Sequence, residues 1–282
     1  MKRNWPAILT ILAVATAWGA TFTLVKNVLA RIAPEPFIFW RFTLAGLILC
    51  VIAFSRRQSL TSSAAAGIVL GLFVFGGYWL QTRALMMISP SRSAFLTGLY
   101  VVLVPFCDRV IRGTRITVNA WIGSALAFAG TAALIGGFDA RPSIGDAMTF
   151  ACAIAFALHV VYSADFTAKH PAIALAAVQV LFVGLAAGVP SLFAPRAPMR
   201  MDVAVVIVFT AVVTTALAFV ALMWSQARVT ATEAAVILAV EPLAASVTSI
   251  LFGEEHVTVG FLIGGVLILA GMVISQIQST HS

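Results

Sequence analysis

The sequence predicts an all-α integral membrane protein whose ten transmembrane helices form two inverted five-helix repeats. Three observations lead to this prediction. Of the 282 residues, 61% are apolar and only 10% are charged; the charges are spaced at intervals close to one bilayer crossing; and the two halves of the chain resemble one another. Ordinary soluble domains carry about 25% charged and 45–50% apolar residues. The composition therefore excludes an ordinary soluble domain.

The intervals between charged residues define the ten segments. A helix needs about 20 mostly apolar residues to cross a hydrocarbon core of ~30 Å. Seven charge-free intervals have about this size, such as residues 4–25 and 170–195. Two further intervals of similar length each contain a single charge, Arg41 or Glu241. The remaining interval, residues 93–107, is short, and its Ser and Thr flanks can extend it.

Strands of a membrane barrel do not fit these segments. Barrel strands have 9–11 residues of alternating polarity, whereas these segments are longer, uniformly apolar and rich in Ala, Leu and Gly. Helices are the other structure that satisfies backbone hydrogen bonds in lipid. Lys2 and Arg3 followed by an apolar run resemble a signal peptide, but the run is too long and nine more segments follow. We therefore expect an uncleaved first helix.

The basic residues indicate the orientation of the chain. An even number of spans places both termini on one side. With the termini inside, nine of the 17 basic residues lie in the cytoplasm, seven lie outside, and Arg41 lies within a span. The positive-inside rule then favours cytoplasmic termini in the plasma (inner) membrane. The net charge of +7 is spread along the chain without a basic patch interleaved with aromatics, so no nucleic-acid partner is expected.

The two halves align at an offset of about 137–141 residues. Leu103–Pro105 can be laid on Val240–Pro242, each in the second-to-last helix of its half. Five helices are an odd number, so the second copy must be inverted relative to the first. We expect the repeats at residues 1–137 and 138–282. Inverted repeats are typical of secondary transporters, whose substrate site lies near the midplane between the repeats.

Several motifs resemble those of the EamA-type branch of the drug/metabolite transporter superfamily, over essentially the whole chain. The matching stretches are Trp18–Phe22, Arg41 with Ala45, Ala84–Pro105, and Glu241–Pro242 followed by Gly253–Glu254. The resemblance implies ten helices in two inverted repeats, inside termini and export of small metabolites, prominently amino acids including aromatic ones. The first half departs from the pattern, because Arg112–Thr114 stands where the second half has Gly253–Glu254.

Two charged residues within spans are the sharpest candidates for a substrate site. A mid-span carboxylate costs on the order of 2.5–3.5 kcal/mol on insertion scales, so Glu241 should face a cavity or a partner. It either contacts a substrate amine or carries a proton that couples transport to pH; alternatively, it braces the chain at Pro242, which lacks an N–H. Arg41 either binds a substrate carboxylate bidentately, or reaches the lipid headgroups or caps neighbouring helices.

Polar and aromatic stripes supply further candidates for substrate binding. Such stripes should turn away from lipid, toward other helices or a cavity. Packing residues and, for Tyr and Trp, interfacial belts are the alternative interpretation. These candidates are Trp18 and Thr21 in the first span, Tyr78, Trp79, Gln81 and Thr82 in the third, Thr97 and Tyr100 in the fourth, and His159, Tyr162 and Ser163 in the sixth.

Two prolines are candidate hinges. Pro105 and Pro242 stand at matching positions of the fourth and ninth spans, where each would remove one hydrogen bond and kink its helix. Paired kinks suit the rocking of one repeat against the other, and a static bend is the alternative.

We predict a secondary transporter that exports small metabolites, amino acids above all, by alternating access at a midplane cavity. No phosphate-binding G-x-x-x-x-G-K-[ST] motif occurs in the sequence, which argues against ATP as the energy source. An intramembrane enzyme and a channel-like subunit are the alternatives, but paired acids, metal-ligand spacing and rings of charge are all missing. The expected partners are a small-molecule substrate and the lipid bilayer, with a monomeric protein and no metal or cofactor.

Overall fold

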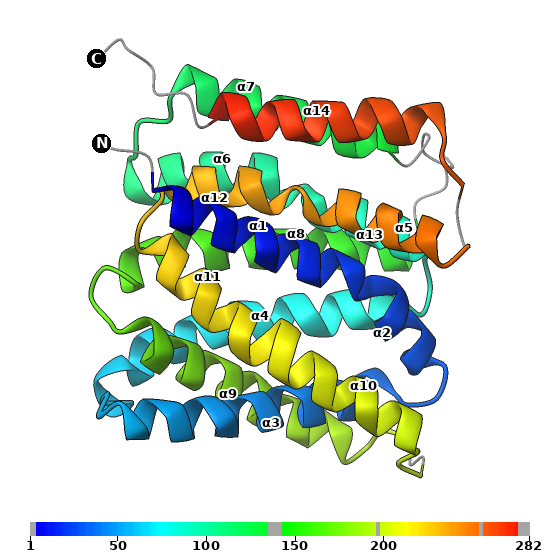
Figure 1. Cartoon of the computed structure of the whole chain (residues 1–282). Helices are drawn as coiled ribbons and strands as arrows, with labels where there is room; N and C mark the ends of the chain where they lie inside the picture. Colours follow the sequence, from blue (N-terminus) through cyan, green and yellow to red (C-terminus); the bar gives the residue numbers. More distant parts are fainter. Residues whose placement is uncertain (1–3, 135–142, 196–197, 254–255, 276–282) are drawn as a thin grey trace.

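The computed structural model describes residues 4–134, 143–195, 198–253 and 256–275, and within these ranges all regular structure is helical (Figure 1). The first half contains α1 (Trp5–Ala20), α2 (Phe22–Leu29), α3 (Pro34–Ser55), η1 (Thr61–Ser63), α4 (Ala64–Ala84), α5 (Pro90–Gly98), α6 (Tyr100–Arg112) and α7 (Val118–Leu134). The second half contains α8 (Ile144–Phe166), α9 (Ala172–Ser191), α10 (Met201–Ala211), η2 (Val212–Leu217), α11 (Ala218–Gln226), α12 (Ala231–Leu238), α13 (Glu241–Leu251) and α14 (Val259–Ser275).

The helices combine into ten apolar spans. Within the described ranges, eight continuous or composite helices are long and apolar enough to cross a membrane, and α7 and α14 are shorter apolar helices. The predicted all-α membrane fold is thereby confirmed. We define the terminal face as the end of the bundle where α1 begins and α14 ends, and the opposite face as the end where α2 and α4 end (Figure 1).

The short spans are not where the charge intervals placed them. The fourth span, expected to be the shortest, runs over 21 residues from Arg92 to Arg112. Asp108 does not end it, because its carboxylate is buried and accepts a hydrogen bond of 2.8 Å from Arg112 one turn later. The shorter helices are instead the fifth and tenth spans, α7 and α14, with 17 residues each.

Besides the third span, in which η1 leads directly into α4, four spans are composite. α1 is separated from α2 at Thr21, whose hydroxyl donates a hydrogen bond of 2.8 Å to the Trp18 carbonyl. α5 and α6 meet at Leu99, and α12 and α13 are separated by residues 239–240. In the eighth span, the π-helix η2 joins α10 to α11. Such interruptions redirect side chains and loosen the regular hydrogen-bond ladder, and membrane transporters commonly place them next to substrate sites.

The two halves pack as partners rather than as separate lobes. α3 lies against α9, and α7 lies against α14, so each pair takes one helix from each half. In Figure 1, α7 and α14 form a layer of their own at the top of the bundle. Glycines allow the backbones of α7 and α14 to approach each other closely: a Cβ at Gly130 would lie 2.7 Å from the Gly264 carbonyl oxygen. Small residues are needed wherever helix backbones approach this closely.

Candidate functional site

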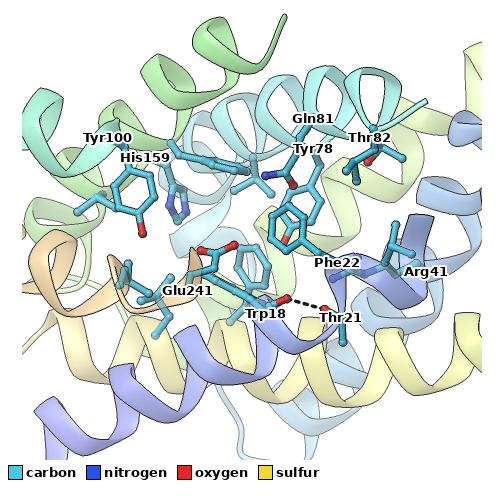
Figure 2. A pocket seen from close by; sticks show the side chains of 18 residues that line it. Trp18, Thr21, Phe22, Arg41, Tyr78, Gln81, Thr82, Tyr100, His159 and Glu241 are labelled. Carbon is cyan, nitrogen blue, oxygen red and sulfur yellow. Dashed lines mark hydrogen bonds between the residues drawn. The ribbon is translucent and has the colours of Figure 1, made fainter. Parts of the chain in front are cut away.

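A cavity lies between helices of both halves (Figure 2). It contains about 780 Å³ of space between protein atoms, part of it open to solvent. Small-molecule sites typically occupy ~300–1,000 Å³. Its walls come from α1, α2, α3, α4 and α6 of the first half and from α8, α11, α12 and α13 of the second.

Most of the residues predicted from the sequence line this cavity. They are Trp18, Thr21, Arg41, Tyr78, Gln81, Thr82, Tyr100, His159 and Glu241. They come from six helices that are widely separated in the sequence, so only the folded bundle brings them together. Four predicted residues, Trp79, Thr97, Tyr162 and Ser163, are not among the lining residues. Whether the lining residues bind substrate stays a prediction.

Arg41 is held inside the bundle rather than at the membrane surface. Its side chain is buried, its Nε donates to Thr215 Oγ1 at 2.8 Å and its Nη2 donates to Thr214 Oγ1 at 3.1 Å. Both threonines lie in the π-helix η2, whose wider turn presents them side by side. The guanidinium also lies over the rings of Tyr78 and Phe42, at 5.2 and 5.3 Å. This geometry orients a cation toward the cavity and keeps it away from the lipid headgroups.

Glu241 is the first residue of α13, directly after the break in the ninth span. Its side chain is buried at the cavity wall, and within the described part of the chain its carboxyl group forms no hydrogen bond and no ion pair. The N-terminal end of a helix favours a negative charge. The site therefore contains a carboxyl group that the protein positions but leaves without a partner.

His159 is fixed by a buried glutamine. Its Nε2 lies 2.8 Å from Gln179 Oε1 on α9 and 3.5 Å from Ser163 Oγ on α8. Because Oε1 can only accept, the imidazole donates from Nε2 to Gln179. Ser163 therefore contacts His159, which lines the cavity, without lining the cavity itself. Tyr162 points elsewhere and stacks on Phe73, with 5.5 Å between the ring centroids.

Aromatic rings form the apolar wall of the cavity. Tyr78 packs edge-on against Phe156 at 5.6 Å, and Trp18 packs against Phe219 at 5.7 Å. The indole Nε1 of Trp18 donates to the Thr214 carbonyl at 2.8 Å, so the ring is fixed in place. In Figure 2, Trp18, Phe22 and Tyr78 lie between Glu241 and Arg41, and Tyr100 lies near Glu241. This wall suits an apolar or aromatic substrate group.

The remaining predicted residues support the wall from behind or lie outside it. Thr97 accepts a hydrogen bond of 3.0 Å from Gln81 Nε2, which fixes the orientation of a lining amide. The Trp79 ring lies beneath the Arg83 guanidinium, 5.1 Å from it, away from the cavity.

The cavity lining repeats between the two halves. Trp18 and Phe156 are 138 residues apart, and Tyr100 and Glu241 are 141 residues apart. The same spacings relate Thr21 to His159 and Tyr78 to Phe219. The sequence did not reveal the apolar residues of the lining, since nothing in it distinguishes them from packing residues. For Phe156 and Phe219, the spacing between the repeats was a signal that could have identified them. The missed lining residues are Phe22, Val25, Val74, Leu85, Phe156, Val160, Phe219, Leu222 and Leu238.

The candidate hinges differ in their surroundings. Pro242 occupies the first turn of α13, where the missing N–H removes no helical hydrogen bond. Pro105 lies inside α6, six residues after the break at Leu99. Their hinge role stays a prediction. Glu254 of the Gly253–Glu254 pattern and the expected repeat boundary at 137/138 lie outside the described residues.

The donor set offers no metal site in the part of the chain that the structure describes. No group of three or more His, Cys, Asp or Glu side chains converges there. Cys152 is buried, and Cys50 and Cys107 are half-buried free thiols within spans.

A glycine allows α1 to approach Glu241, which leads to a testable prediction. A Cβ at Gly19 would overlap the Glu241 carbonyl oxygen and lie 2.8 Å from Ala244 Cβ. We expect Gly19→Val to lower the melting temperature and abolish transport, because overpacking costs ~1–3 kcal/mol and displaces Glu241. Differential scanning fluorimetry and a flux assay measure both. Gly76→Val is the matched control, since a Cβ at Gly76 meets no atom within 4 Å; equal loss in both variants would contradict the role of Gly19.

Comparison with known proteins identifies the family. The model of the EamA-like transporter family matches residues 5–136 and again residues 143–276. An uncharacterized transporter from Archaeoglobus fulgidus is 27% identical over 275 residues, which cover 96% of this chain and 86% of that protein. The uncharacterized transporter YyaM from Bacillus subtilis is 25% identical over 272 residues, covering 90% and 88%. A crystal structure with 20% identity superimposes with a TM-score of 0.82 over 95% of both chains. The chain is a multi-pass membrane protein that belongs to the EamA-like transporter family.

Proposed function

We propose that this protein is a secondary transporter that exports neutral amino acids, aromatic ones included, through the cavity described above. One observation carries this proposal: a single cavity with aromatic walls contains both a fixed guanidinium, Arg41, and an unpaired carboxyl group, Glu241. Figure 2 places Arg41 at one end of the cavity, and Glu241 with His159 and Tyr100 at the other. A neutral amino acid carries the two complementary charges and an apolar side chain.

The chemistry of each end defines its role in this proposal. The hydrogen bonds to Thr214 and Thr215 use Nε and Nη2 of Arg41, so Nη1 remains for Tyr78 or for a substrate carboxylate. Glu241 accepts the substrate ammonium group, and the rings of Trp18 and Tyr78 contact its side chain. Charge-assisted hydrogen bonds of this kind are the strongest polar contacts available to a site.

The transport cycle and the topology belong to the same proposal. The repeats rock about the cavity so that it faces each side of the membrane in turn, driven by a solute or ion gradient. We place the protein in the inner membrane with both termini in the cytoplasm, as the distribution of basic residues favours. The protein acts as a monomer, because helices of both halves of one chain supply the walls of the cavity.

Flux into proteoliposomes tests the substrate class. Radiolabelled phenylalanine is the probe, and phenethylamine and 3-phenylpropionate are the competitors that each lack one of its charges. We expect saturable phenylalanine flux, with each analogue competing at least about tenfold more weakly than phenylalanine, since each loses one charge-assisted contact.

Other outcomes would exclude the proposal in distinct ways. Flux that never saturates would indicate a channel. Equal competition by all three compounds would show that the charges are not recognised, and the amino-acid class would fail. Cleavage or modification of lipid or peptide by purified protein that moves no metabolite would indicate an enzyme.

A further inference from the structure

Gln226, the last residue of α11, is buried without any hydrogen bond. Its side chain is 2% exposed, and neither Oε1 nor Nε2 has a partner in the described part of the chain. Burying an unpaired polar group costs ~1–3 kcal/mol, and native proteins rarely leave one unpaired. An amide that is unpaired at both atoms therefore indicates that another conformation, or a bound molecule, supplies its partners.

The position of Gln226 connects it to the cavity. Phe219, Leu222 and Gln226 lie on one face of α11, because they are separated by three and four residues. Phe219 and Leu222 line the cavity, and Gln226 lies one turn further toward the terminal face. Gln226 thus continues the cavity wall beyond the point at which the lining now ends.

A second polar side chain continues the wall of the neighbouring helix in the same direction. α8 and α11 both run toward the terminal face and approach each other where the rings of His159 and Phe219 lie 6.2 Å apart (Figure 1). Ser163 follows His159 by one turn on the same face of α8 and is fully buried, and its hydroxyl reaches only the His159 ring, at 3.5 Å. Ser163 and Gln226 therefore extend the polar lining toward the terminal face from two helices.

The present cavity extends the other way. Its lining reaches Val25, in the middle of α2, and Leu85, just past the end of α4, both on the side of the opposite face. Toward the terminal face, apolar side chains of the core, among them Ile11, Leu70 and Val104, close the bundle. The two polar atoms of the Gln226 amide have no access to substrate in this arrangement.

We propose that Gln226, together with Ser163, forms a second substrate-contact position that is used when the cavity opens to the terminal face. There the Gln226 amide donates to the carboxylate and accepts from the ammonium group of a zwitterionic substrate. This inference rests on the proposed function for the substrate, but the opening that it requires can be tested without knowing the substrate.

Cysteine labelling tests the opening. Gln226→Cys is treated in sealed vesicles of known orientation with a membrane-impermeant maleimide, and mass spectrometry locates the modified residue, so the three native cysteines are retained. We expect modification from the terminal face only, although the side chain is buried in the present state. Ser225→Cys is the matched control, because Ser225 is equally buried and points about 100° away around the helix.

The labelling has clear contrary outcomes. No modification of Gln226→Cys from either side, or modification from the opposite face, would overturn the proposal. Equal modification of Gln226→Cys and Ser225→Cys would also overturn it, because this would indicate fraying of the helix end rather than opening of the cavity.

Side-specific kinetics test the contact itself. For Gln226→Met, which has similar length but forms no such hydrogen bonds, we expect the half-saturation constant for phenylalanine to rise about tenfold at the terminal face and to change little at the opposite face. Gln81→Met, which alters an amide of the present cavity, should raise the constant at the opposite face. Unchanged or symmetrically raised constants for Gln226→Met would overturn the contact. If the wild-type protein moves no amino acid, the substrate proposal fails while the labelling result stands by itself.

Discussion

Glu241→Gln is expected to lower the rate of amino-acid flux at subsaturating substrate by about tenfold to a hundredfold, since a hydrogen bond to a charged group contributes ~1.5–3 kcal/mol. The side chain keeps its shape, so the packing of α13 should persist and the melting temperature should change little. What is lost is the negative charge that faces the substrate ammonium group. Flux in proteoliposomes, measured over a range of pH, is the appropriate assay.

A matched control exists in the preceding helix. Glu233 lies in the first turn of α12, in a capping box with Thr230, outside the cavity. Glu233→Gln retains an acceptor for the cap, so we expect flux within about twofold of the wild-type protein. If Glu241→Gln folds and its flux and pH dependence both match those of the wild type, then Glu241 neither binds the substrate nor couples transport to protons, and its role is to brace the helix start.

Arg41→Met is expected to abolish measurable flux and to destabilise the protein. The variant removes the cation of the cavity and the donor that Thr214 and Thr215 share. Thr214 keeps its hydrogen bond to the Thr210 carbonyl, whereas a buried hydroxyl left unpaired at Thr215 costs ~1–3 kcal/mol. Arg41→Lys separates the two effects. Lysine retains the charge but cannot reproduce the planar contacts with both threonines, so we expect flux reduced by about tenfold.

The control for Arg41 is an arginine outside the cavity. Arg228 follows α11 and lies over the Trp224 ring at 4.0 Å on the outside of the bundle. Arg228→Lys should leave flux and melting temperature close to those of the wild type. Full flux in Arg41→Met, with the protein folded, would exclude a carboxylate-binding role for Arg41.

Much of the fold could be predicted because lipid imposes a strict rule on the sequence. Every span must be helical and nearly free of charge, so the intervals between charges revealed the ten helices directly. The lengths of the individual spans were less predictable. Asp108 interrupts a charge-free interval but not the helix, because Arg112 neutralises it one turn later, and a count of intervals contains no information about such pairing.

The charged residues of the site could be predicted, because a charge within a span is costly, whereas its apolar residues could not. Arg41 and Glu241 stood out because charges are rare within spans, and both lie at the cavity. Phe219 and Leu222 gave no signal, since apolar residues cover lipid-facing, buried and cavity-lining positions alike. Trp79 shows the converse error: it shares its segment with the lining residues but turns toward Arg83.

The sequence by itself determined that this protein crosses the membrane many times and that its halves are related. Burial in lipid requires each span to be apolar and nearly free of charge, and this pattern occurs in both halves. It also identified the charged residues that any folded arrangement must shelter. Only the tertiary structure decided which of them meet. The breaks at Thr21 and Leu99 lie at or next to side chains that line the cavity, and the π-helix at 212–217 presents the two threonines that hold Arg41. These arrangements depend on contacts between helices far apart in the sequence, and no local pattern encodes them.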